Sequence, residues 1–167
     1  KHLYYTIRDE VREVKSDHLV AKLPSSIVSA SWARTGTALF QLSSGWYLYV
    51  PPFRVIALSL TAQKAYLSPD GQRILYQIAS TLYRLVVSSA SSSYITTLLP
   101  TEMVEAATFD DNGETAVLTL GSENTYRVVS ASLAGGEPKT IRSGLTNLPS
   151  VALRPNGDVV VVTPTAI

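Results

Sequence analysis

The sequence contains no cysteine, one methionine and two histidines. Without cysteine the chain can form neither a disulfide nor a thiolate metal site, so it is compatible with any redox compartment. Charged residues make up 16% of the chain and the net charge is +1, which leaves no concentrated basic face for nucleic acid. No apolar run approaches the roughly 20 residues of a membrane span. The chain starts at Lys1, without an initiator methionine, which indicates a processed protein or a piece of a longer one.

What the chain does have is a high hydrophobic content of 46% over 167 residues, enough to bury the core of one domain. No segment shows a helical period of 3.6 residues, whereas short apolar runs alternate with turn residues throughout. These features predict an all-β fold.

Glycine-containing turns recur along the chain with spacings of 35, 42 and 44 residues. The four turns are Arg34-Thr35-Gly36, Pro69-Asp70-Gly71, Asp111-Asn112-Gly113 and Pro155-Asn156-Gly157. Asp-Gly and Asn-Gly pairs between apolar runs are typical of β-hairpins, and we expect type I′ turns here. Repeats of about 40 residues with four strands each are typical of β-propellers.

Other residues recur at nearly constant distances from the glycines of these turns. A large apolar residue lies four positions before each glycine, at Trp32, Leu67, Phe109 and Leu153. A tyrosine lies 11, 12 and 13 positions after the first three glycines, at Tyr47, Tyr83 and Tyr126. We therefore expect four strands per repeat, with Trp32 in the core and the tyrosines packed between blades.

The repeats predict a single propeller domain over residues 1–167, with four blades of four antiparallel strands. Three blades are expected at about 27–59, 63–99 and 104–142. The two ends complement each other, so 150–167 and 1–16 are expected to form the remaining blade and close the ring by pairing of the N- and C-terminal strands. The alternatives are a half-barrel that self-associates with a second copy, and a fragment of a six- to eight-bladed parent.

The segment from Tyr66 to Tyr76, with Ser68-Pro69-Asp70-Gly71 at its turn, resembles the repeat of TolB-type (WD40-like) propellers. The other three turns are degenerate versions of this motif. The resemblance implies a propeller, often part of a larger bacterial envelope protein, whose role is to hold other proteins. It also implies a periplasmic or extracellular location.

The chemistry-bearing residues do not form a recognisable catalytic set. His2 and His18 have no carboxylate cluster spaced as a partner, so neither a metal site nor a Ser-His-Asp triad is expected. The acidic turn at 110–114 lacks the spacing of an EF-hand calcium loop. We therefore expect no cofactor and no enzyme activity.

Loops that join the second strand to the third, and one blade to the next, open onto one face of a propeller. On this face we place the candidate binding residues Trp46, Glu102, Glu123, Asn124 and Asn147, although for Trp46 packing between blades is favoured over binding. The sequence thus predicts a non-catalytic domain that binds a protein partner and acts as a scaffold. The alternatives are a propeller that gates or forms a hydrolase- or lactonase-type site, and a sensor ectodomain.

Overall fold

The computed structural model describes residues 4–52, 54–154 and 156–164, which form seventeen β-strands and no helix. The all-β prediction is confirmed. Among these residues there is consequently no helix able to cross a membrane. The chain divides into two compact units, an N-terminal unit of residues 1–61 and a C-terminal unit of residues 62–167.

The N-terminal unit contains two antiparallel sheets. Sheet A has the strand order β1 (Tyr4–Ile7), β2 (Glu10–Glu13) and β3 (Leu19–Lys22). Sheet B consists of β4 (Ile27–Trp32), β5 (Ala38–Leu42), β6 (Gly45–Val50) and β7 (Arg54–Leu58), in that order. The two sheets share one buried cluster, in which Val11 and Leu23 pack with Phe40 and Tyr49.

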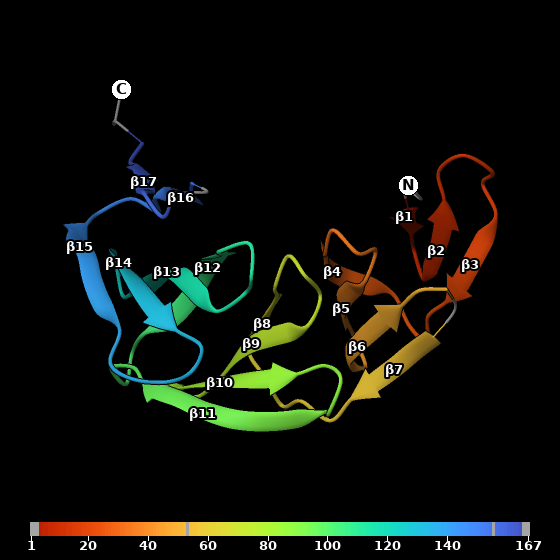
Figure 1. Cartoon of the computed structure of the whole chain (residues 1–167), viewed down its shortest axis with the longest axis horizontal. Coiled ribbons are helices and arrows are strands. Elements are labelled where there is room, and N and C mark those ends of the chain that lie inside the picture. The colour runs from red at the N-terminus through yellow and green to blue at the C-terminus, as the bar shows by residue number, and fades with distance from the viewer. Residues whose placement is uncertain (1–3, 53, 155, 165–167) are drawn as a thin grey trace. The chain divides into compact units, whose positions relative to one another are not determined.

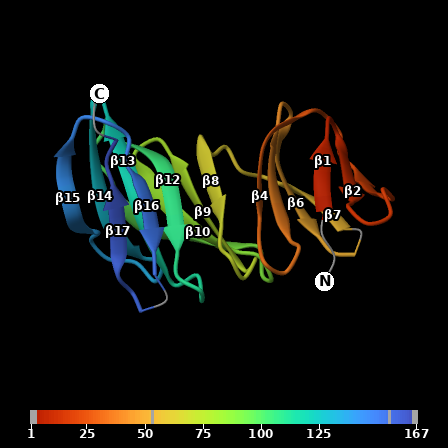
Figure 2. The same cartoon turned by 90° about the horizontal axis from the view of Figure 1, so that it is seen from above.

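The C-terminal unit contains three antiparallel sheets (Figures 1 and 2). Sheet C consists of β8 (Lys64–Leu67), β9 (Arg73–Ile78), β10 (Thr81–Val86) and β11 (Ser91–Thr97). Sheet D consists of β12 (Met103–Phe109), β13 (Thr115–Ser122), β14 (Thr125–Ser132) and β15 (Lys139–Leu145). Sheet E has two strands, β16 (Ser150–Leu153) and β17 (Val159–Val162).

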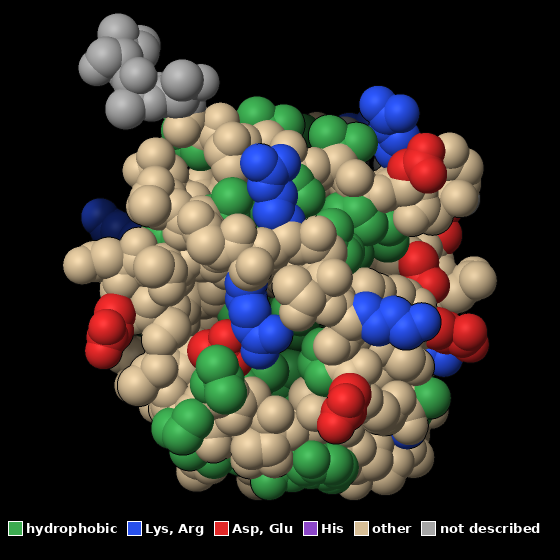
Figure 3. Space-filling model, turned by 90° about the vertical axis from the view of Figure 1, so that its left-hand side faces the viewer, with side chains coloured by type: hydrophobic (Ala, Val, Ile, Leu, Met, Phe, Trp, Pro, Cys, Tyr) green, Lys and Arg blue, Asp and Glu red, His purple; other side chains and the backbone are tan. Residues whose placement is uncertain are grey.

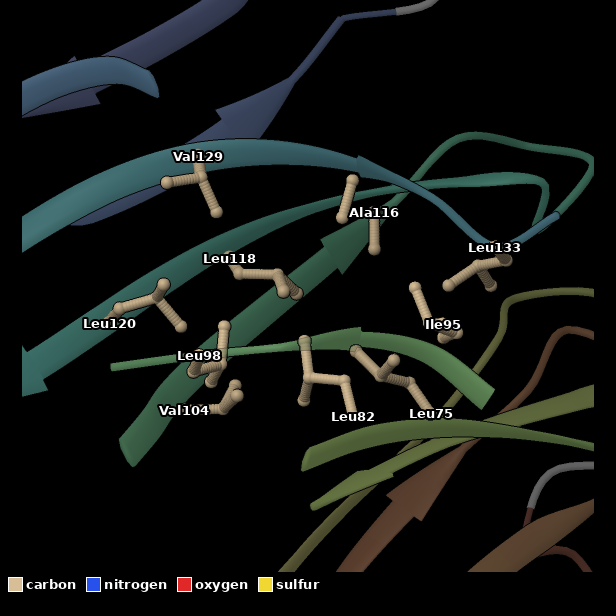
Figure 4. Packing of buried hydrophobic residues seen from close by; sticks show 11 residues of the cluster. Leu75, Leu82, Ile95, Leu98, Val104, Ala116, Leu118, Leu120, Val129 and Leu133 are labelled. Carbon is tan, nitrogen blue, oxygen red and sulfur yellow. The ribbon is translucent and has the colours of Figure 1, made fainter. Parts of the chain in front are cut away.

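Strand β13 is buried on both faces and holds the C-terminal unit together. Because side chains alternate along a strand, Ala116, Leu118 and Leu120 point toward sheet C. They form a cluster there with residues such as Leu75 and Leu82 (Figure 4). Val117, on the opposite face, packs with residues of sheet E. Face-to-face packing of successive four-stranded sheets is the arrangement of propeller blades.

All four glycine turns form hairpins, but not of the expected type. In each of them the glycine N–H donates to the carbonyl three residues earlier, as Gly36 does to Ala33 at 3.1 Å and Gly113 to Asp110 at 3.1 Å. The glycines have φ between 64° and 87°, while Thr35, Asp70, Asn112 and Asn156 are absent from the residues of positive φ. The loops are therefore longer than two-residue type I′ turns and place a single residue, glycine, in the left-handed region.

The expected closure into four blades is wrong. The N-terminal strands already form the three-stranded sheet A, because residues 19–22 add β3 after the turn at Asp17, whose φ is 52°. The C-terminal strands β16 and β17 form sheet E, and the described termini thus belong to two different sheets. The described residues form five sheets, more than the four of the predicted ring. Residues 1–3 and 165–167, which were expected in the blade shared by the two ends, lie outside the described residues.

Trp32 also differs from its expected core position, since its side chain is 37% exposed. It lies at the end of β4, where it stacks on Tyr4 at 5.8 Å between ring centroids. Phe40 and Tyr49 meet it edge-on, so aromatic contacts cover only part of the indole.

Candidate functional site

Four loops lie at one end of the C-terminal unit. These are the β9–β10 turn at 79–80, the β11–β12 link at 98–102, the β13–β14 turn at 123–124 and the β15–β16 link at 146–149. Strand register brings the last three together, because Met103 is opposite Gly121 and Leu145 is opposite Tyr126. We call this the pocket end of the unit.

Glu102 is the buried acid of the pocket end, with 3% of its surface exposed. Arg127, on β14, donates from Nε to one carboxylate oxygen and from a terminal nitrogen to the other at 2.8 Å. The backbone N–H of Leu99 donates to the carboxylate at 3.0 Å. A bidentate arginine–carboxylate contact of this kind is both strong and geometrically specific.

These contacts keep both partners charged. Burial by itself raises the pKa of Glu102, but the hydrogen bonds from Arg127 and from the Leu99 N–H outweigh it, and the net pKa is lowered. The hydrogen bonds to Glu102 correspondingly raise the pKa of Arg127. The pair is therefore an ion pair with no net charge.

Gln77 on β9 anchors the link that carries Glu102. Its side-chain nitrogen donates to the carbonyls of Ala79 and Glu102, each at 2.7 Å, and its oxygen accepts from the N–H of Val104 at 2.8 Å. Gln77 is fully buried, so these bonds satisfy its polar atoms. The result is a rigid backbone around Glu102 and the start of β12.

A bulge in β15 opens the pocket beside Arg127. Tyr126 is opposite Leu145 and Val128 is opposite Arg142, so the single residue Arg127 faces two residues of β15. The second of these, Gly144, has φ of +69°. Bulges of this kind re-aim side chains and are frequent beside binding sites.

The resulting pocket has a volume of about 300 Å³. Its walls combine leucines, hydroxyl-bearing side chains and the ion pair, from Leu99, Glu102, Leu120, Ser122, Thr125, Tyr126, Arg127, Ser143 and Gly144. Leu120 is buried, whereas Leu99 is 60% exposed at the rim. The pocket is thus lined by both polar and apolar groups.

The structure brings four of the five predicted binding residues to the pocket end. Glu102 lies in the pocket wall, and Glu123 and Asn124 form the turn between its wall residues Ser122 and Thr125. Asn147 lies in the β15–β16 link and donates to the carbonyl of Pro164 at 3.4 Å. Trp46 is in the N-terminal unit, where it lies on β6 between Gln41 and Leu58 and is 6% exposed, which favours its packing role.

Sequence reasoning missed Arg127 and the β15 bulge. A signal for Arg127 was present, because Tyr83-Arg84 in sheet C repeats the order of Tyr126-Arg127 in sheet D. The links before sheets B and C, residues 23–26 and 59–63, contain no acid that could replace Glu102. The ion pair is therefore not a standard part of the repeat.

A second cavity, of about 680 Å³, lies in the N-terminal unit and is lined by Thr6, Arg8, Asp9, Ser25, Ser26 and Ile27. The backbone carbonyls of Arg8 and Asp9 bind Ile27 N and Leu23 N and so tie sheet A to the start of sheet B. None of the lining residues is fully buried. Its acid Asp9 pairs with Lys22 at 3.9 Å but is partly exposed, so the charge is not buried as that of Glu102 is.

Across the described residues there is no group of three or more histidine, cysteine or acidic side chains placed to hold a metal ion. His18 is exposed on the turn between β2 and β3. His2, the other histidine considered, lies outside the described residues.

Comparison with known proteins reveals the fold and no close relative. No protein-family model matches the chain, and no curated protein matches it. Among solved structures, TolB from Acinetobacter baumannii superposes with a TM-score of 0.65 at 18% identity over 99% of this chain and 46% of its own. Kuenenia stuttgartiensis hydrazine synthase gives 0.62 at 15% identity over 96% of this chain and 58% of its own.

The extracellular domain of a one-component system from B. thetaiotaomicron gives a TM-score of 0.63 at 16% identity, over 96% of this chain and 24% of its own. The chain spans between 24% and 58% of the length of these structures. Sequence identities this low carry information about the fold rather than about activity. The order of antiparallel sheets and these superpositions agree with the resemblance found in the sequence, and the chain has the fold of a TolB-type β-propeller.

Proposed function

We propose that this chain is a non-catalytic propeller module that binds a partner protein through the pocket end of its C-terminal unit. The observation that carries the proposal is the Glu102–Arg127 ion pair, which is held in an open pocket and does not recur in sheets B and C. Sheets B and C form without an equivalent pair, so the repeat does not require it in order to fold. A charged pair beside an open pocket is available for recognition of a partner.

Exposed leucines next to the pocket support a protein as the partner. Leu99 and Leu148 lie in the two links of the pocket end and are both exposed. Arginine and tyrosine, which Arg127 and Tyr126 provide, are over-represented among the residues that dominate binding energy. Neutral groups cover most of the surface in Figure 3, where a basic and an acidic side chain adjoin each other among hydrophobic ones.

We also propose an extracytoplasmic location, within a larger envelope protein. The support is the fold shared with TolB and with a domain described as extracellular. The alternatives are a sensor ectodomain, which would use the same surface for a signal ligand, and a propeller that gates or forms a hydrolase-type site. A tightly held metal ion in the purified protein, detected by mass spectrometry, would favour the enzyme alternative.

The test is quantitative capture of envelope proteins by immobilised chain and by single variants. Leu99→Ser and Glu123→Ala remove an exposed apolar group and an exposed charge from the pocket end, and we expect each to lower capture about tenfold, or 1.4 kcal/mol. Lys139→Ala is the control, because Lys139 is exposed at the start of β15, away from the pocket end. Equal capture by all three variants and the parent would contradict the proposal.

A further inference from the structure

The geometry points to the chemistry that the pocket recognises: we propose that it takes one uncharged carboxamide side chain, glutamine above all, from the partner polypeptide. This inference rests on the proposed function and deepens it. It follows from three properties of the pocket, namely its charge, its unused hydrogen-bonding groups and its size.

The charge of the pocket disfavours an ionic ligand. Arg127 is already neutralised by Glu102, whose oxygens accept from two nitrogens of Arg127 and from the Leu99 N–H. A carboxylate ligand would compete with the buried Glu102 carboxylate for the same guanidinium, and the two like charges would repel each other. An ammonium ligand would meet the outward side of Arg127. A neutral polar group has neither cost.

The unused hydrogen-bonding groups match a carboxamide. Arginine has five N–H donors, of which Glu102 takes two and Thr140 one, at 3.4 Å. The remaining donors can bind an amide oxygen. Thr125 uses its hydroxyl hydrogen on the carbonyl of Ser122 at 3.0 Å, so its oxygen lone pairs can accept from an amide NH₂. A carboxamide presents one acceptor and two donors, so it offers a partner both to Arg127 and to Thr125.

The size and the apolar wall favour glutamine. A volume of about 300 Å³ is at the lower end of small-molecule sites, which suits one side chain better than a cofactor. Leu120 and Leu99 line the same pocket as Arg127 and Thr125. The two methylene groups of glutamine can lie against these leucines while the amide reaches the polar wall.

The test is NMR titration of the ¹⁵N-labelled chain, observing the Arg127 Nε–H and the Gly144 backbone amide. The probes are the N-acetyl, N-methylamide derivatives of glutamine, glutamate and leucine. We expect the glutamine probe to shift both signals and to bind at least tenfold more tightly than the glutamate and leucine probes. Binding of the glutamate probe that equals or exceeds that of glutamine would overturn the inference, and so would the absence of shifts at the solubility limit of the glutamine probe.

A matched pair of variants locates the site. Thr125→Val removes the accepting oxygen at an exposed position and keeps the shape, so we expect at least a fivefold loss of glutamine binding. Lys139→Ala should bind the probe as the parent does. An unchanged affinity in Thr125→Val would contradict the proposed contact.

The two proposals fail in different ways. If Leu99→Ser and Glu123→Ala lower capture of envelope proteins but no probe binds, the surface is correct and the carboxamide inference is wrong. If capture is unchanged in both variants, the proposed function is wrong whatever the probes do.

Discussion

At the scale of single residues, the pocket shows how a β-sheet protein holds a charge that is almost fully buried. Removing Glu102 from water is costly, and this cost is offset by the donors of Arg127 and by the Leu99 N–H. Arg127 itself stays partly exposed and can still meet a ligand. The arrangement is stable only while Glu102 is ionised.

This requirement predicts a pH dependence of stability. Because the folded pKa of Glu102 lies below its ordinary value of 4.5, the ion pair stabilises the fold fully above about pH 4.5. The stabilisation is lost as the pH falls through the lower, folded pKa. Glu102→Gln should lower the free energy of unfolding by about 2 kcal/mol at neutral pH and by much less at pH 3.

Urea unfolding of the parent and of Glu102→Gln at the two pH values checks this expectation. Glu123→Gln is the matched control, since it removes an exposed carboxylate from the neighbouring turn. A constant difference between the parent and Glu102→Gln across the pH range would show that the ion pair does not stabilise the fold.

Glu123 gives a second prediction at this scale. Its φ of 53° places a non-glycine residue in the left-handed region, at a cost on the order of 1 kcal/mol. Asparagine tolerates this conformation better. We therefore expect Glu123→Asn to raise the free energy of unfolding by about 0.5 to 1 kcal/mol, whereas Glu123→Ala should change it little; thermal or urea unfolding measures both. A destabilised Glu123→Asn would mean that the glutamate side chain itself supports the turn.

At the scale of elements, turns of successive sheets support each other in the C-terminal unit. Ser68 and Asp70 hold the β8–β9 turn, with Ser68 Oγ accepting from Arg73 N at 2.9 Å. Arg73 then donates to the carbonyl of Asn112 in the β12–β13 turn at 2.6 Å. Gly113 completes this contact, because a Cβ there would lie 2.8 Å from Cβ of Ser68.

Two glycine variants separate backbone strain from this close approach. Gly113→Ala combines a φ of +64° with the clash against Ser68, whereas Gly157→Ala has a φ of +87° and no atom within 4 Å of the new Cβ. Both should be destabilised by about 1 kcal/mol through strain, and Gly113→Ala by roughly 1 to 3 kcal/mol more. Equal losses in urea unfolding would show that the two turns can move apart without cost.

At the scale of the whole molecule, the sheets differ in how completely they are paired. Sheets B, C and D have four strands each, but sheet E has two, and no described strand pairs with the outer edge of β17. Val162 on this strand is exposed. An unpaired, valine-rich edge is a template for pairing with another strand.

We therefore expect the isolated chain to self-associate as its concentration rises, which sedimentation velocity can measure. Val162→Lys places a charge on the exposed edge without touching the cluster formed by Val159 and Val161, and it should weaken association. If the chain stays monomeric at all concentrations, or if Val162→Lys associates like the parent, the edge of β17 does not mediate association.

Features encoded within a hairpin were predictable from the sequence. The four glycine turns and the strands between them depend on residues that are close in sequence, so the sequence alone predicts them. Their recurrence then indicates the all-β propeller fold. The turn type was less predictable, because a two-residue and a longer loop both use glycine. Residues 19–22 were missed as a strand because four residues that include Lys22 give only a weak pattern.

The placement of Glu102, Glu123, Asn124 and Asn147 at one end also followed from the sequence, because alternating strands send every second loop to the same side. The partner of Glu102 did not follow. Arg127 lies 25 residues away and meets Glu102 only because the β12–β13–β14 register and the Gln77 anchor hold them together. The sequence by itself determined the local conformation and the repeat, whereas the tertiary structure decided the pocket, the bulge beside it and the sheet to which each terminal strand belongs. The reason is physical: turn and strand preferences act between near neighbours, but pairing and burial are settled by which faces pack together.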